Sequence, residues 1–186
     1  RYLQAKNEFE TFVAELLPVL ASIDKDVAGL EPSQCVFRIY RDVRFSPDKS
    51  PYKTNMGAAM GKGGRKSHYA SYYIHLEPGN SFAGGGIWMP QGPVLKALRR
   101  EVFYNAAAFR EILEGKDFSK YFDGLMGEKL KRPPRDFPVD FPDVELLKHK
   151  SYAVGTPLAD SLITSNKLIA ELEKIYAALY PFNRFI

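Results

Sequence analysis

Four basic residues in one short segment are the first side chains of this sequence that could carry chemistry. Arg41, Arg44, Lys49 and Lys53 lie in a stretch that also contains two prolines, and Tyr52 places a phenol beside them. An arginine guanidinium donates two parallel hydrogen bonds to a phosphate or carboxylate, so a proline-stiffened loop of this kind could clamp a small anion. The alternative is structural, because two aspartates in the same segment could pair with these cations and hold the loop together.

A histidine and a carboxylate two positions apart form the second candidate. His75 and Glu77 share one face of a predicted strand with Tyr73, because successive side chains of a strand point to opposite faces. An imidazole beside a carboxylate suits general acid–base catalysis, so we predict His75 and Glu77 as catalytic residues and Tyr73 as an orienting donor. The pair could also supply two metal ligands, but zinc needs at least three and the spacing places no third, so no metal is predicted. A hydrogen-bonded sheet face without a catalytic role is the remaining alternative.

Two glycine-rich segments could bring a ligand close to the backbone. Residues 61–67 combine glycines with basic residues but lack the spacing of a phosphate-binding P-loop. We therefore predict a flexible basic hairpin tip there. The triplet Gly84–Gly86 falls inside a predicted strand, where glycine marks a bulge, a bend or the close approach of another backbone or a ligand.

The elements that would position these residues follow from hydrophobic spacing and composition. Helices are predicted over 2–27, 93–102, 106–114 and 156–180, and strands over 35–41, 54–60, 69–77, 82–89 and 151–155, with one short strand near residue 130. In the strand over 69–77, alternation places Tyr72 and Ile74 on one face and Tyr73 and His75 on the other. Because the strands cluster instead of alternating with helices, the predicted fold class is α+β. We expect a single domain over 1–186, with a mainly antiparallel sheet of about five strands flanked by N-terminal and C-terminal helices.

Composition excludes several classes of protein. The chain has 186 residues, of which 45% are hydrophobic and 26% charged, as in ordinary soluble domains and unlike disordered or collagen-like chains. Cys35 is the single cysteine, which rules out an internal disulfide and favours a reducing compartment, so we predict a cytoplasmic location. No apolar run reaches the ~20 residues that span a bilayer, and no membrane partner is predicted. The chain opens on Arg1 and not on methionine, so we expect its natural N-terminus to be incomplete here.

The positive charge of the chain is concentrated in one region. The net charge is +4, but residues 35–66 contain eight basic and two acidic side chains and therefore carry +6. Such a field attracts phosphates, carboxylates and nucleic acids.

Three blocks of the sequence resemble one protein family. The first block is Arg41-Asp42-x-Arg44-Phe45-x-x-Asp48-Lys49-x-Pro51-Tyr52-Lys53. The others are 72–79, 81–86 and Met89-Pro90, and Arg132-Pro133-Pro134 followed by 147–151. Together they resemble the domain of unknown function 2461 family over nearly the whole chain. That family is mainly bacterial and occurs as a single domain, so the resemblance implies one domain and transfers no activity, cofactor or catalytic residue.

These observations favour a pocket that binds a small phosphorylated or carboxylated ligand, in a protein that could be an enzyme acting on that ligand. One alternative is a nucleic-acid-binding domain that uses the basic region 35–66, although no known nucleic-acid motif is present. The other is a non-catalytic protein-interaction module in which the arginines and aspartates pair internally. The sequence indicates no cofactor and no oligomeric state.

Overall fold

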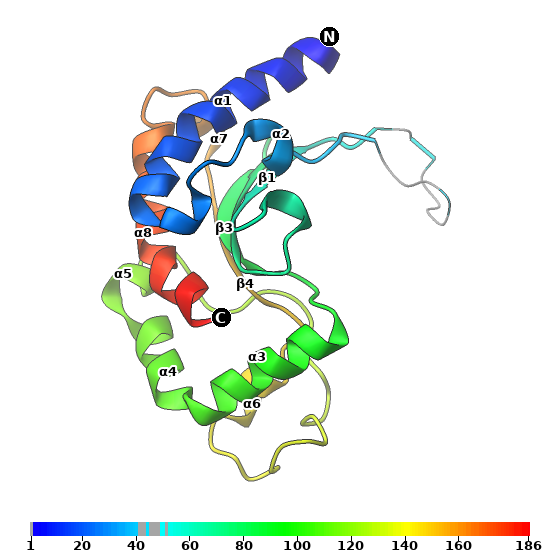
Figure 1. Cartoon of the computed structure of the whole chain (residues 1–186), viewed down its shortest axis with the longest axis vertical. Helices are drawn as coiled ribbons and strands as arrows, with labels where there is room; N and C mark the ends of the chain where they lie inside the picture. The colour runs from blue at the N-terminus through cyan, green and yellow to red at the C-terminus, as the bar shows by residue number, and fades with distance from the viewer. Residues whose placement is uncertain (1, 41–43, 45–48, 51) are drawn as a thin grey trace.

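The computed structural model describes the whole chain except residues 1, 41–43, 45–48 and 51 (Figure 1). The strands are β1 (Met56–Met60), β2 (Ser71–Leu76), β3 (Phe82–Ile87) and β4 (Tyr152–Pro157). The longer helices are α1 (Tyr2–Ile23), α3 (Gly92–Tyr104), α4 (Ala106–Glu114) and α8 (Leu168–Phe185). The short helices are η1 (Lys25–Val27), α2 (Pro32–Cys35), η2 (Gly64–Lys66), α5 (Lys116–Ser119), α6 (Val144–Leu147) and α7 (Asp160–Ile163).

The strands form one antiparallel sheet in the order β1-β2-β3-β4. Its register sets Ala58 opposite Ile74 and Tyr73 opposite Gly84, and Gly84 in turn lies opposite Gly155. The α+β class and the antiparallel sheet are thus confirmed. Over the described residues the sheet has four strands and not the predicted five.

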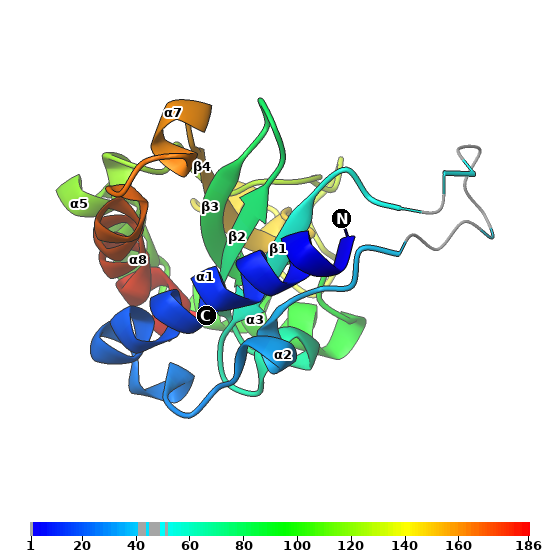
Figure 2. The same ribbon diagram turned by 90° about the horizontal axis from the view of Figure 1, so that it is seen from above.

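The missing fifth strand is the one predicted over 35–41. Cys35 ends α2, and Val36 forms only an isolated bridge to Ala58. The Phe37 N–H donates to the Gly57 carbonyl of β1 over 2.9 Å, and Tyr40 bridges to Tyr52, so the segment runs beside β1 and the residues before it without forming a continuous ladder. The described residues 36–40 and 52–55 form an arm that projects from the body (Figures 1 and 2). The segment has the β-propensity that predicted a strand, but its pairing is limited to these isolated bridges and does not extend into a ladder.

One face of the sheet carries the core, as the alternation in β2 predicted. Tyr72 and Ile74 are 1% and 0% exposed. Helices α1 and α8 cover this face, with α8 packed on β3 and α1 beside it (Figures 1 and 2). Tyr176 of α8 donates a hydrogen bond from its hydroxyl to the Tyr73 carbonyl over 2.9 Å. The opposite face, which carries Tyr73 and His75, is the one that remains available to a ligand.

The predicted start and end of the last helix are wrong. Thr156 and Pro157, expected as an N-cap and first turn, are the last residues of β4, opposite Ala83 and Phe82. The chain then forms α7 and α8, and α8 continues through Pro181 to Phe185. An interior proline costs a helix about 3 kcal/mol, but Phe182 beside it is fully buried, so packing outweighs the lost hydrogen bond.

Smaller differences concern the ends of other predicted elements. The first helix stops at Ile23, and Asp24 caps η1 because its carboxylate accepts a hydrogen bond from the Asp26 N–H over 3.0 Å. The strand expected near residue 130 is an isolated bridge between Lys129 and His149. In the described part of the chain, none of the helices is long and apolar enough to cross a membrane.

Candidate functional site

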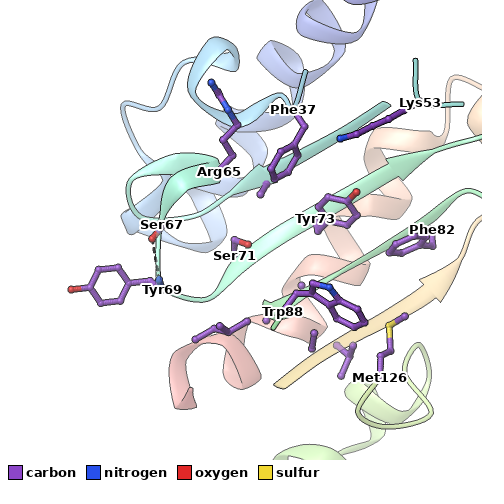
Figure 3. Close-up of a pocket in the computed structure, with 16 residues that line it drawn as sticks. Phe37, Lys53, Arg65, Ser67, Tyr69, Ser71, Tyr73, Phe82, Trp88 and Met126 are labelled. Atoms are coloured by element: carbon purple, nitrogen blue, oxygen red, sulfur yellow. Dashed lines mark hydrogen bonds between the residues drawn. The ribbon is translucent and has the colours of Figure 1, made fainter. Parts of the chain in front are cut away.

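A pocket of about 490 Å³ lies over the open face of the sheet (Figure 3). Aromatic rings form much of its wall: Phe37, Tyr69, Tyr73, Phe82 and Trp88. Two cationic side chains also line it, Lys53 and Arg65. The other lining residues are small or aliphatic apart from two serines: Ala59, Ser67, Ser71, Gly85, Gly86, Ile87, Met126, Ala153 and Val154.

The strands supply the floor of this pocket. Ser71 and Tyr73 point from β2 to the open face because they alternate with the buried Tyr72. Phe82 from β3 lies next to Tyr73, with ring centroids 5.5 Å apart. The glycine triplet of β3 allows the neighbouring strands to approach closely, because a Cβ on Gly84 would lie 2.0 Å from the Val154 carbonyl oxygen. The close approach predicted at the triplet is therefore that of a neighbouring strand.

Trp88 and Met126 form the β4 side of the wall. The residue after Trp88, Met89, has a left-handed φ of 46° and donates its N–H to the Ser151 hydroxyl over 3.0 Å. Gly127 lies against the indole, where a Cβ would come within 3.2 Å of the ring. Met126 is fixed by its own N–H, which donates to the Ala153 carbonyl over 2.7 Å. Backbone contacts thus set both side chains over β4.

The two cations reach the pocket from segments far apart in sequence. Lys53 lies on the arm, where its N–H donates to the Ile39 carbonyl over 2.8 Å. Its Nζ lies 5.9 Å from the Phe37 ring centroid. Arg65 belongs to η2 and donates a guanidinium hydrogen bond to the Ser33 carbonyl. Gly64 makes this docking possible: its φ is +71°, and a Cβ there would lie 2.6 Å from the Gln34 carbonyl oxygen. Figure 3 shows Phe37 between the two cations.

Tyr73, His75 and Glu77 form a continuous hydrogen-bonded row along β2. The Tyr73 hydroxyl lies 3.2 Å from His75 Nδ1, and His75 Nε2 lies 3.4 Å from Glu77 Oε2. The imidazole also stacks on Phe82, with ring centroids 4.8 Å apart. Burial raises the pKa of the Tyr73 phenol, which therefore stays protonated unless a base takes its proton.

Glu77 is held by donors on three sides. Its carboxylate accepts hydrogen bonds from the Thr54 hydroxyl and from Asn80 Nδ2, the latter over 2.9 Å. The pKa of the Glu77 carboxyl is lowered by the hydrogen bond from Thr54, which has the largest effect, by the bond from Asn80 and by the contact with His75. The outer end of the row is thus an anchored, ionised carboxylate at neutral pH.

The structure separates the predicted anion clamp. Lys53 lines the pocket, whereas Arg44, Lys49 and Tyr52 are exposed and are not among the described residues that line it. Arg41 lies outside the described residues. Of the predicted catalytic pair, His75 and Glu77 are in contact as expected, but they lie behind Tyr73, and Tyr73 is the member of the row that lines the pocket.

Sequence reasoning missed several pocket residues. Arg65 falls inside the basic region, but the 61–67 turn was predicted as a flexible tip and contains a 3-10 turn docked on α2. Phe37 and Trp88 lie near the ends of predicted strands, and nothing in their spacing brings them together. Ser71 could have been predicted, because it lies two positions before Tyr73 on the same strand and therefore on the same face of the sheet.

Within the described residues, no group of three or more His, Cys, Asp and Glu side chains is arranged to hold a metal ion. The pocket brings together two cationic side chains, a row of aromatic rings and a tyrosine in contact with a histidine.

Comparisons with known proteins place the chain in one family. Neither the comparison with curated proteins nor the comparison with solved structures gave a match. A family model described as "Conserved hypothetical protein (DUF2461)" matches residues 1–185. Since the match covers nearly all of the sequence, it agrees with the resemblance carried by the three sequence blocks, and the chain belongs to the DUF2461 family of conserved hypothetical proteins.

Proposed function

We propose that this protein binds a small phosphorylated or carboxylated ligand in the pocket over the open face of the sheet. The observation that carries the proposal is the presence of Lys53 and Arg65 in the wall of an otherwise mainly apolar pocket of about 490 Å³. Ligand sites combine an apolar lining with a few convergent polar groups, and this volume suits a metabolite-sized molecule. A guanidinium and an ammonium group supply the charge that an anionic group requires.

The aromatic wall adds a second feature to the expected ligand. Phe37 lies 6.3 Å from Tyr73 between ring centroids, and Tyr73 lies 5.5 Å from Phe82, so the rings form a row across the floor. Such rings favour a flat or apolar body through stacking and area burial. The ligand we expect therefore has an anionic group near Phe37, which Lys53 and Arg65 flank, and a planar or apolar part over the rings of Tyr73 and Phe82.

Thermal unfolding with a panel of anions tests this proposal. The panel contains inorganic phosphate, nucleoside monophosphates, sugar phosphates and dicarboxylates. A ligand at a hundredfold excess over its dissociation constant adds about 2.7 kcal/mol of stability, or about 5 to 10 °C for a chain of this length. We expect Lys53→Gln and Arg65→Gln to lose that shift, and Lys66→Gln to keep it, because Lys66 is exposed beside Arg65 and does not line the pocket.

If none of these compounds stabilises the wild type, or if Lys66→Gln loses the shift as fully as Arg65→Gln, the pocket is not the anion site. Folding of each variant is checked by its melting temperature without ligand, so that a lost shift is not confused with a lost fold.

A second candidate, nucleic-acid binding, is favoured by exposed aromatic rings on the arm. Tyr40 and Tyr52 are 52% and 51% exposed, and their centroids lie 5.4 Å apart. Tyrosines beside basic residues are the side chains on which single-stranded bases stack. Binding of a fluorescent oligonucleotide should then weaken steeply between low and moderate salt. Absent binding, or binding indifferent to salt, would eliminate this candidate.

A further inference from the structure

One residue of the hydrogen-bonded row reaches the pocket, and the other two stand behind it. Tyr73 lines the pocket, His75 contacts its hydroxyl over 3.2 Å, and Glu77 contacts the far side of the imidazole over 3.4 Å. Hydroxyl, base and orienting carboxylate are the parts of an activated nucleophile, whatever fold carries them.

We propose that Tyr73 is a nucleophile, activated by His75 and positioned through Glu77, that accepts a phosphoryl group from a phosphate ester in the pocket. This inference rests on the proposed function, because Lys53 and Arg65 must hold the ester. In the step, the Tyr73 oxygen forms a bond to phosphorus and its proton passes to His75 Nδ1. The bond from phosphorus to the leaving oxygen breaks, and that oxygen takes the proton from the imidazolium. Water then cleaves the tyrosine ester by the reverse path, with His75 taking a proton from water and returning one to the Tyr73 oxygen.

The hydrogen bonds around His75 support this assignment. The Glu77 carboxylate can only accept, so Nε2 carries the proton of that contact and Nδ1 presents its lone pair to the Tyr73 hydroxyl. The imidazolium formed during the step would lie against an ionised carboxylate. Stacking on Phe82 at an interplanar angle of 18° restrains the ring, so the base is oriented before a ligand arrives.

A glycine on β1 makes room for the Tyr73 hydroxyl. Gly57 lies opposite His75 in the register, and a Cβ on it would come within 2.6 Å of the Tyr73 hydroxyl oxygen. Any larger residue would push that oxygen away from its place beside the imidazole. Gly57 is therefore a positioning residue, and it offers a variant that disturbs the row without removing any of its functional groups.

The substrate class follows from which anionic group of the ligand a nucleophile can attack. Of the two proposed ligand classes, an ionised carboxylate resists attack by a nucleophile, whereas phosphoryl transfer proceeds when cations neutralise the charge on the phosphoryl oxygens. Lys53 and Arg65 share the pocket with the Tyr73 ring, and in Figure 3 the Tyr73 hydroxyl points to the Lys53 side. A phosphate ester is thus the ligand that uses all of these groups.

Labelling with an aryl sulfonyl fluoride tests the activation without knowledge of the substrate. The tetrahedral sulfur resembles a phosphoryl centre: the tyrosine oxygen attacks it, fluoride leaves, and the phenol proton passes to the base. Peptide mass spectrometry would follow labelling of each tyrosine at neutral pH. Exposure alone predicts that Tyr69 and Tyr104, which are 63% and 76% exposed, react before the half-buried Tyr73. We expect Tyr73 to react at least about tenfold faster than either.

Variants identify the cause of that reactivity. His75→Gln should slow labelling of Tyr73 about a hundredfold, the typical contribution of a positioned general base. Glu77→Gln and Gly57→Ala should slow it as well, and His68→Gln, which removes an exposed imidazole, should not. Tyr73 labelling no faster than that of Tyr69, or unchanged in His75→Gln, would overturn the proposal.

The result also separates this inference from the binding proposal, because labelling needs no bound anion. Slow labelling with an intact phosphate-dependent thermal shift would overturn the nucleophile and leave the ligand pocket. Fast, His75-dependent labelling with no shift from any phosphate compound would overturn the phosphate-ester substrate. Fast labelling together with a shift that requires Lys53 and Arg65 supports both.

Discussion

His149 should make the folded protein sensitive to mild acid. Its side chain is 4% exposed, and within the described structure its buried Nδ1 has no hydrogen-bond partner. Burial, reinforced by the positive charge of Lys129 and opposed by Glu145, lowers the pKa of the imidazole from 6.5 to about 4. The backbone around it is fixed, because Arg99 donates to the His149 carbonyl over 3.0 Å.

The sign and size of the effect follow from the two pKa values. Above pH 6.5 the imidazole is neutral in both states, and its contribution to stability is fully present. As the pH falls from 6.5 towards 4, the unfolded chain binds a proton that the folded protein does not, so stability is lost. The loss amounts to about 2 kcal/mol at pH 5 and approaches about 3 kcal/mol below pH 4.

Urea unfolding at pH 7 and pH 5 measures this loss. The wild type should lose about 2 kcal/mol more than His149→Gln between these two pH values, whatever the stability of the variant at pH 7. His68→Gln is the matched control, because it removes an exposed imidazole and should keep the wild-type dependence. If His149→Gln and the wild type lose the same stability between pH 7 and pH 5, the burial argument is refuted.

Two further substitutions test how the sheet is packed. Gly85→Ala places a Cβ 2.2 Å from a β2 carbonyl oxygen, so we expect a loss of about 3 kcal/mol or more in urea unfolding. Gly92→Ala, which has open space around its Cβ, should change stability by less than about 1 kcal/mol. Tyr72→Phe removes the hydroxyl that donates to the buried Asp24 carboxylate over 3.0 Å, and should cost about 2 kcal/mol. Tyr104→Phe, at an exposed position, should cost almost nothing; equal losses in the two tyrosine variants would contradict the role given to this hydrogen bond.

The sequence predicted the sheet well where local pattern and tertiary pairing agree. The period of two in β2 assigned Tyr72 and Ile74 to the core and Tyr73 to the open face, because a half-buried strand imposes that alternation on its own residues. It failed over 35–41, where the segment pairs with residues 52–58 only through isolated bridges at Val36 and Tyr40. Strand propensity describes the residue, whereas a strand also requires a continuous ladder with its partner.

The same distinction explains which site residues were found. His75 and Glu77 were paired correctly because residues two apart on one strand must be neighbours on one face. The pocket could not be predicted in the same way, since Phe37, Arg65 and Trp88 approach one another only after α2, η2 and β3 have docked. The basic segment after Tyr40 was selected by charge density, and of its described residues only Lys53, at its end, lines the pocket. Charge density shows that an anion would be attracted, but it does not show where the wall of a pocket is built.

The distribution of exposed apolar side chains gives an independent reason to place function on the open face. Ten large hydrophobic side chains are exposed in the described structure, and four of them, Phe37, Tyr69, Trp88 and Met126, line this single pocket. The opposite face of the same sheet is closed by α8, which approaches so near that a Cβ on Gly85 would lie 2.8 Å from a methyl group of Leu179. A second covering helix would bury the four side chains and gain roughly 25 cal/mol for each Å² removed from water. A face that stays uncovered despite this gain, and that carries two cations and a tyrosine in contact with a histidine, fits the proposed ligand pocket better than an incomplete core.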